Sequence, residues 1–223
     1  MKVAALFSGG KDSTYAVYLA QQRGWDVAKL ITMVPTHGES HMFHVPNINL
    51  CGLLAEAMGI PHAAFPTDGE EERELGDLEK ALSGLNVQGI VSGAIASDYQ
   101  HARIDRLCHG LGMASFSPLW RWKQEAVLAD IVEAGFRVMI VGVYADGMGK
   151  EWLGRVLDPG SLKDLAELAG RNRMNVSGEG GEFETLVLDG PNFCRRLEIS
   201  ESKTQWGGGR GELIVNKAGL ADK

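Results

Sequence analysis

The sequence lacks long apolar runs and has few cysteines, and both absences limit where the chain can work. No stretch of the 223 residues approaches the run of about eighteen apolar residues that a membrane-spanning helix needs. We expect no signal peptide, because the N-terminus enters an apolar strand without a preceding basic segment. The cysteines lie far apart with no C-x-x-C pair, which argues against a zinc ribbon or cluster site and favours a reducing compartment. The expected location is the cytoplasm, with no membrane partner.

Positive charge is also scarce. Lysine and arginine number 22 against 29 aspartates and glutamates, which gives a net charge of -7. A broad electrostatic grip on RNA or DNA is therefore disfavoured, and nucleic acid is not the expected partner. Apolar residues make up 44% of the chain, enough to fill the core of one large or two small domains.

A glycine turn near the N-terminus carries the strongest functional signal. It follows the apolar run at residues 3–7 and reads Ser8-Gly9-Gly10-Lys11-Asp12-Ser13. Glycines let backbone N–H groups approach a ligand, and a helix start presents unpaired donors with a partial positive charge. Lys11 adds a full charge, and the two serine hydroxyls can donate to phosphate oxygens. The turn predicts a phosphate site, although its spacing is not that of a G-x-x-x-x-G-K-[ST] loop. The alternative is an ordinary glycine turn that merely starts a helix.

Apolar strands alternate with helical patterns through the first half of the chain. We expect strands at 3–7, 26–34, 60–65 and 113–116, and a fourth strand that runs into a second glycine turn within 89–95. Helices are expected at 13–22, 47–58 and 69–85, with a further helix capped by Asp98. This alternation predicts an open, doubly wound parallel α/β sheet of the Rossmann-like kind, with helices on both faces. The acidic run 70–74 is interpreted as a solvated helix face.

Ligands of such sheets bind at the carboxyl ends of the strands. We expect the crevice between the first two strands in the sequence, with the adenine beside the backbone of Ile31, Thr32 and Met33. A second glycine turn, which contains Gly93 and Ala94, follows the fourth strand and is expected to face the same nucleotide.

The pattern changes after residue 120. A helix at 124–133, a strand at 137–144 and a helix at 162–169 precede antiparallel-looking strands at 183–188, 195–201 and 212–215, with a glycine loop at 207–209. We therefore predict an ATP-binding domain at 1–120 and a smaller C-terminal α+β substrate domain at 121–223. No flexible linker separates them, so we expect the two domains to pack closely.

Three histidines lie together in the polar connection 35–45, namely His37, His41 and His44. They would share one face only in a helix, and Pro35 and Gly38 argue against a helix there. A mobile loop over the nucleotide pocket is therefore favoured over a zinc site. No metal ligand is predicted, and whether these histidines bind a metal stays open.

Several segments together resemble one known family. The segment S-G-G-K-D-S is similar to the PP-loop of the N-type ATP pyrophosphatases, whose HUP-class fold is Rossmann-like. Three further segments are similar to those of the diphthine–ammonia ligases, including their archaeal single-module members: Ser92-Gly93-Ala94-Ile95 with Tyr99, Gln100 and Arg103; Ser117-Pro118-Leu119-Trp120; and Asn175 with residues 178–191, which begin G-E-G-G-E-F-E-T. The resemblance runs from Lys2 to about Val215.

The resemblance implies an ATP-dependent amide ligase. In this family the PP-loop grips the β,γ-phosphates while the α–β bond breaks, so that AMP is placed on a substrate carboxylate and pyrophosphate leaves. Ammonia then attacks the acyl-adenylate, which converts diphthine on translation elongation factor 2 to diphthamide. ATP and Mg²⁺ are the implied cofactors, and Lys11, Asp12 and Ser13 are the implied catalytic residues. Ammonia is expected either free, as ammonium, or from another subunit, since no cysteine lies in a recognisable glutaminase motif.

A substrate pocket follows from the same resemblance. The trimethylammonium group of diphthine suits aromatic faces and nearby acids, and the candidates are Tyr99, Gln100, Arg103, Trp120, Glu179, Glu182, Phe183 and Glu184. On a strand, Glu182 and Glu184 share one face and Phe183 the other. In the alternative, Trp120 and Trp122 form domain-interface core, the glutamates face solvent, and Arg103 pairs with Asp98 or Asp105.

Two other functions stay open. One is a different PP-loop enzyme that modifies tRNA, which an acidic chain without a C-x-x-C pair fits poorly. The other is a non-catalytic nucleotide-binding regulator with the same sheet, against which the intact Lys11-Asp12-Ser13 argues. The sequence does not decide the oligomeric state, and a homo-oligomer stays open.

Overall fold

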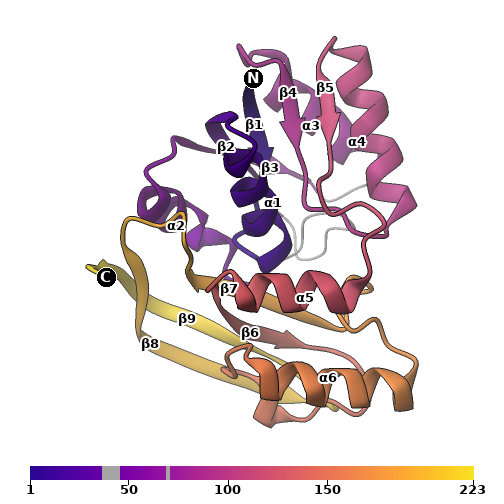
Figure 1. Cartoon of the computed structure of the whole chain (residues 1–223), viewed down its shortest axis with the longest axis vertical. Coiled ribbons are helices and arrows are strands. Elements are labelled where there is room, and N and C mark those ends of the chain that lie inside the picture. The colour runs from indigo at the N-terminus through magenta and orange to yellow at the C-terminus, as the bar shows by residue number, and fades with distance from the viewer. Residues whose placement is uncertain (37–45, 69–70) are drawn as a thin grey trace.

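A computed structural model describes residues 1–36, 46–68 and 71–223, and it contains two sheets (Figure 1). The first sheet has five parallel strands in the order β3-β2-β1-β4-β5. These strands are β1 (Lys2–Leu6), β2 (Asp26–Pro35), β3 (His62–Thr67), β4 (Gly89–Val91) and β5 (Ala114–Phe116). The prediction of a doubly wound parallel sheet is confirmed.

The second sheet is antiparallel, with four strands in the order β7-β6-β9-β8. Its strands are β6 (Arg137–Val143), β7 (Phe183–Asp189), β8 (Arg196–Gly207) and β9 (Arg210–Ala221), and it lies with α5 (Gln124–Glu133) and α6 (Pro159–Asn172) below the first sheet in Figure 1. The predicted C-terminal α+β arrangement is therefore also confirmed.

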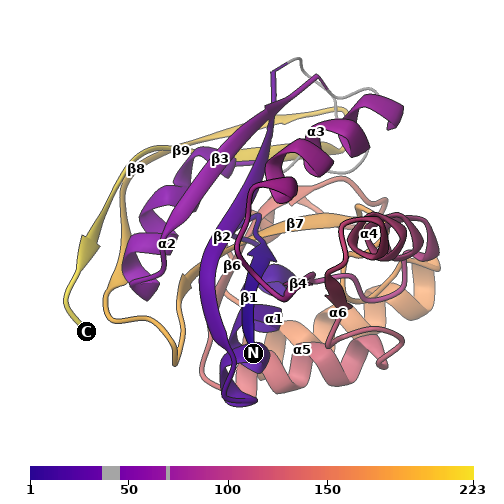
Figure 2. The ribbon, with the colours of Figure 1, turned by 90° about the horizontal axis from the view of Figure 1, so that it is seen from above.

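Helices cover both faces of the first sheet (Figure 2). On one face, α3 (Glu71–Ser83) and α4 (Asp98–Gly110) bury Leu78, Leu82 and Ile104 against Ile31 and Ile90. On the other face, α1 (Lys11–Gln22) and the short α2 (Cys51–Met58), which follows a 3-10 turn at Ile48–Leu50, belong to the same core as the second sheet.

This shared core joins the two sheets. The rings of Tyr15 and Tyr18 on α1 lie nearly perpendicular to the ring of Phe136, which precedes β6, at centroid distances of 5.8 and 5.5 Å. The buried side chain of Asn47 donates to the Leu213 carbonyl at 2.9 Å and accepts from the Val215 N–H at 2.7 Å. A buried amide that satisfies two backbone groups of β9 fixes the position of the second sheet relative to α2.

The strand order corrects the expected place of the crevice. The chain runs outward from β1 through β2 to β3 and then returns to the other side of β1 to form β4. The topological switch point, where ligands of such sheets bind, therefore lies between β1 and β4 and not between the first two strands.

Other differences from the predicted elements have local causes. Within 89–95 the strand ends at Val91, and the predicted glycine turn that follows it packs against the start of α1. The N-cap of α4 is Ser97, whose hydroxyl accepts from the Gln100 N–H, and Asp98 lies in the first turn. Glu74 is fully buried, so the acidic run is not a wholly solvated face.

The C-terminal hairpin is longer than predicted, since β8 and β9 each have twelve residues. The half of β8 nearest the turn is largely exposed and polar. It therefore lacks the alternation of apolar and polar residues by which a strand is recognised in a sequence. The segment with His37, His41 and His44 lies outside the described residues. No described helix combines the length and apolar character that a membrane crossing would need.

A substitution at Gly93 tests the close packing of the second glycine turn. An added Cβ would lie 2.6 Å from the Ser13 backbone nitrogen and 2.7 Å from the Asp12 carbonyl carbon. We expect Gly93→Ala to lower the free energy of unfolding by about 1–3 kcal/mol, because overpacking against backbone cannot be relieved by a side-chain rotation. Urea unfolding followed by circular dichroism measures this change.

Gly110→Ala is the matched control. Gly110 is the last residue of α4. Apart from its chain neighbours and the nearby backbone of α4, no described heavy atom would lie within 4 Å of a Cβ added there. We expect this variant to be unchanged or up to about 1 kcal/mol more stable. Equal stability of the two variants would contradict the close approach of the β4–α4 turn to α1.

Candidate active site

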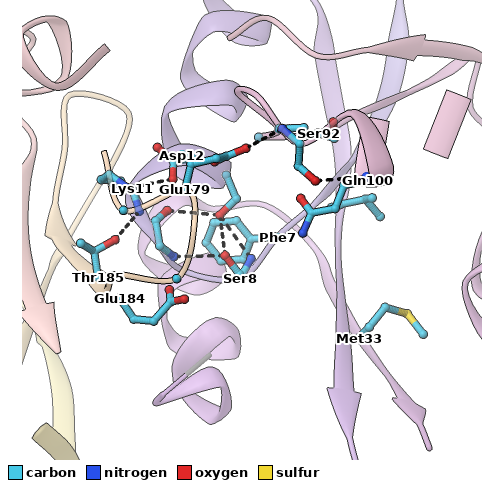
Figure 3. Close-up of a pocket in the computed structure, with 18 of the residues that line it drawn as sticks. Phe7, Ser8, Lys11, Asp12, Met33, Ser92, Gln100, Glu179, Glu184 and Thr185 are labelled. Carbon is cyan, nitrogen blue, oxygen red and sulfur yellow. Dashed lines mark hydrogen bonds and ion pairs between the residues drawn. The ribbon is translucent and has the colours of Figure 1, made fainter. Parts of the chain in front are cut away.

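A cavity of about 490 Å³ opens at the carboxyl edge of the first sheet (Figure 3). The glycine turn before α1 forms its floor, β2 and the β4–α4 turn form one side, and β7 with its preceding loop forms the other. Fourteen of the predicted site residues line it: Ser8, Gly10, Lys11, Asp12, Ser13, Ile31, Met33, Gly93, Ala94, Tyr99, Gln100, Glu179, Phe183 and Glu184.

Internal hydrogen bonds hold the shape of the glycine turn. The Ser13 hydroxyl accepts from the Ser8 N–H at 3.2 Å and lies 3.1 Å from the Ser8 hydroxyl. Gly10 is the N-cap of α1 and offers no side chain to the first N–H groups of the helix. The serines thus organise the turn, and the helix start keeps backbone donors for an anion.

The second sheet holds the same turn from the other side. The Gly9 carbonyl accepts from the Val187 N–H of β7 at 3.0 Å. The Lys11 N–H donates to the Thr185 hydroxyl, also on β7, at 3.1 Å. Two bonds from one strand therefore fix the backbone of the turn on both sides of Gly10.

Lys11 and Asp12 form an ion pair at the head of α1. The Lys11 ammonium lies 2.9 Å from Asp12 Oδ2 and 5.3 Å from the centroid of the Phe183 ring. The pKa of the Asp12 carboxyl lies above its ordinary value, mainly because the group is buried. The charge and hydrogen bond of Lys11 oppose this rise, and the charge of Glu179 adds to it. Asp12 Oδ1 is buried and accepts no hydrogen bond from the described residues. The lysine is thus held within the cavity wall by a neighbouring carboxylate.

Glu184 is a carboxylate that faces the cavity from β7. Burial, as the main cause, raises its pKa to about 7; Lys11 opposes the shift, and Asp12, Glu179 and Glu212 add to it. Glu184 accepts no hydrogen bond from any residue that the structure describes. It is therefore a group that changes charge near neutral pH and is open to a ligand.

The other two predicted glutamates hold loops. Glu179 Oε1 accepts from the backbone N–H groups of Ile95, Ala96 and Ser97 at 3.0, 3.0 and 3.3 Å, which ties the 178–181 loop to the start of α4. Although Glu179 lines the cavity, its charge is already engaged by three donors.

Glu182 does not line the cavity, and the expected shared face with Glu184 is wrong. The strand begins at Phe183, and the Glu182 carboxylate turns back to accept from the Asn175 N–H at 2.6 Å and the Gly180 N–H at 2.8 Å. These bonds close the glycine-rich loop on itself. The alternation of a strand therefore does not extend to residue 182.

Four further predicted residues also lie outside the cavity lining. Gly9 has φ +76°, and a Cβ there would collide with Leu54. A glycine is therefore needed at this position for the backbone of the turn and not for contact with a ligand. The Thr32 hydroxyl donates to the Phe7 carbonyl at 2.7 Å. The Arg103 guanidinium stacks 3.6 Å from the centroid of the Tyr99 ring, and Trp120 packs on His101.

The alternatives for these side chains are partly excluded. Trp122 is 43% exposed, so it is not interface core. Asp98 pairs with Arg121 at 3.7 Å. Sequence reasoning missed Thr185 and Ser97, both of which line the cavity. The segment G-E-G-G-E-F-E-T contained Thr185, but only the contact between β7 and the glycine turn reveals its role.

No group of three His, Cys, Asp or Glu side chains within the described ranges is arranged to hold a metal ion.

A comparison of structures gives a weak likeness. A protein from Methanocaldococcus jannaschii, described as a predicted subunit of tRNA methyltransferase, aligns over 86% of this chain and 98% of its own, with 16% identity and a TM-score of 0.49. This likeness is too low to support an argument about fold or function.

Sequence comparisons are far more specific. The chain is 32% identical to the diphthine–ammonia ligase of Danio rerio, over 92% of this chain and 88% of that protein. It is 31% identical to that of Homo sapiens, with 91% and 84% covered, and 31% identical to that of Schizosaccharomyces pombe, of which it spans 37%. Family models described as the diphthamide synthase N-terminal and C-terminal domains match residues 1–115 and 123–220. The chain therefore belongs to the diphthamide synthase family, and its curated relatives are named as diphthine–ammonia ligases.

Proposed function

We propose that the chain is an ATP-dependent ligase that converts diphthine on translation elongation factor 2 to diphthamide. The observation that carries the proposal is the buried Lys11 ammonium at the head of α1, set in the wall of a cavity that both halves of the chain line. A regulator that only binds nucleotide does not need a buried cation at the phosphate end, whereas pyrophosphate expulsion does.

The chemistry follows from the poor reactivity of a carboxylate. A carboxylate oxygen attacks the α-phosphorus of ATP, the α–β bond breaks, and pyrophosphate leaves with the bonding electrons. Lys11 and the open N–H groups of α1 stabilise the charge that develops on the leaving group. Mg²⁺, bound mainly by the triphosphate, would neutralise further charge when present.

The nucleotide would span the width of the cavity. Ile31 and Met33 supply an apolar wall on β2 for the base, and the glycine turn lies at the other end of the lining with Ser8 and Lys11. Since ligands at a switch point lie between the strands that flank it, the α-phosphate would sit between β1 and β4. This arrangement directs the reacting phosphorus toward β7.

The modified histidine side chain would enter beside α4. Tyr99 lines the cavity and is 39% exposed, so it stands at the mouth, while Phe183 lines the interior. The face of the Tyr99 ring that the Arg103 guanidinium does not cover would suit the trimethylammonium group of diphthine. Ammonium would then enter from solvent as the second substrate.

One assay tests the proposal against the other two functions. The protein is incubated with Mg·ATP and ammonium, with either diphthine-bearing elongation factor 2 or bulk tRNA, and AMP and pyrophosphate are measured. Release that depends on the elongation factor, with a mass change on the factor equal to amidation, supports the ligase. Dependence on tRNA, or no turnover with either macromolecule, would contradict it.

Substitution of Lys11 tests the phosphate end. Lys11→Met keeps most of the side-chain length that packs on Phe183 and removes the charge, so we expect folding to survive. Pyrophosphate release should fall by about a hundredfold or more, since one preorganised charged donor is lost from the transition state. Steady-state kinetics on the variant and thermal melting of the same sample measure both quantities.

Lys203→Met is the control, because Lys203 is an exposed lysine on the outer hairpin. It should keep wild-type turnover. Turnover of Lys11→Met within about threefold of the control would exclude Lys11 from pyrophosphate expulsion.

Substitution of Glu179 tests whether this carboxylate positions loops or contacts substrate. Glu179→Ala leaves three backbone N–H groups without their acceptor, so kcat/KM for ATP should fall by at least about tenfold. Glu179→Gln keeps an acceptor oxygen in the same place and should recover most of this loss. If Gln is as impaired as Ala, the negative charge itself acts on substrate and the positioning role is wrong.

A further inference from the structure

The proposed ligase reaction needs a step that the nucleotide site does not supply. Ammonium has no lone pair and cannot attack the acyl-adenylate until it loses a proton. The following assignment rests on the proposed function and concerns the group that takes this proton.

Three carboxylates, Asp12, Glu179 and Glu184, line the cavity. Glu182 is near them in the chain but lies outside the lining, and of these four only Glu184 is not engaged by other described residues. Asp12 is paired with Lys11 at 2.9 Å. Glu179 accepts three backbone N–H groups of the β4–α4 turn, and Glu182 turns away to hold the 175–180 loop. Glu184 faces the cavity and accepts no hydrogen bond from the described residues, so it is the carboxylate open to a small cation.

The position of Glu184 follows from the strand that clamps the glycine turn. Its neighbour Thr185 accepts the Lys11 N–H at 3.1 Å, and Val187 on the same strand donates to Gly9. Figure 3 shows Glu184 next to Thr185, on the Lys11 side of the cavity. A cation bound to Glu184 would therefore lie close to the phosphate end, where the acyl-adenylate forms.

The charged groups around Glu184 come from four parts of the chain. Lys11 and Asp12 face it from α1, Glu179 from the preceding loop, and Glu212 from β9. Tyr144, at the end of β6, donates its hydroxyl to Glu212 at 2.7 Å, and burial with these acids holds the pKa of Tyr144 above its ordinary value. One cation among several acids makes the surroundings of Glu184 favourable for ammonium.

We infer that Glu184 is the catalytic base that deprotonates ammonium. Its carboxylate takes one proton from the ammonium ion, which leaves ammonia with a free electron pair. The nitrogen then bonds to the acyl carbon, and the bond from this carbon to the AMP oxygen breaks with its electrons on AMP. The second proton leaves the nitrogen for water, and Glu184 returns its proton to water before the next turnover.

The acidity of Glu184 matches this task. Burial raises the pKa of its carboxyl to about 7, so the group is partly ionised at neutral pH and is a stronger base than an ordinary glutamate. Because the base must be deprotonated to act, kcat/KM for ammonium should rise with pH below about 7 and level off above it.

The test compares two nucleophiles in Glu184→Gln. Ammonium is charged at pH 7 and needs a base, whereas hydroxylamine is largely uncharged there and needs none. With wild-type diphthine-bearing elongation factor 2 and Mg·ATP, we expect the variant to lose about a hundredfold in kcat/KM for ammonium. Its hydroxamate formation with hydroxylamine should fall by less than about tenfold. The break near pH 7 should vanish, and the variant's rate should keep rising with pH as free ammonia increases.

Glu182→Gln is the matched control, since it alters a neighbouring carboxylate that holds a loop. It should reduce both reactions by the same factor and keep the break in the pH profile. Equal losses with both nucleophiles in Glu184→Gln, or a raised KM for the elongation factor alone, would overturn the assignment of Glu184. Wild-type protein that forms neither amide nor hydroxamate would overturn the proposed function itself.

Discussion

The site depends on the contact between the glycine turn before α1 and strand β7 of the second sheet. The Val187 N–H and the Thr185 hydroxyl bond the turn on both sides of Gly10. Neither half of the chain forms the cavity alone, because the first sheet supplies the helix start and the second supplies the wall opposite it. The continuous core around Tyr15, Tyr18 and Phe136 keeps that contact in place.

The acidic side chains in and beside the cavity have different roles because their surroundings differ. Three backbone N–H groups hold the charge of Glu179, and Glu182 closes a loop. Asp12 orients the Lys11 ammonium. Glu184 has neither a hydrogen-bond donor among the described residues nor an adjacent ion pair, and burial raises its pKa to about 7. Four acids of similar sequence context thus acquire different chemistry from the fold.

The architecture could be read from the sequence to a large extent. Continuous apolar strands such as 3–7 and 26–34 predicted the parallel sheet, and the glycine turn predicted the position of the site. The order of the strands could not be read, because a right-handed βαβ unit can add its next strand on either side, depending on which face of the sheet its helix covers. The crevice was therefore expected between the wrong pair of strands. Glu74 is a second example: the acidic run 70–74 did not reveal that the side chain of Glu74 is buried in the folded chain.

Side-chain roles near the site were harder to predict than its location. Thr32, Arg103 and Trp120 lie close in sequence to cavity residues but turn to other partners. The central claim is that the triphosphate binds in the turn at residues 8–13. A crystal structure with Mg²⁺ and an ATP analogue that resists cleavage between the α- and β-phosphates tests it most directly. Phosphate oxygens are expected within hydrogen-bond distance of Lys11 Nζ and of the N–H groups in the first turn of α1 that do not bond to Thr185; a triphosphate bound elsewhere would contradict the claim.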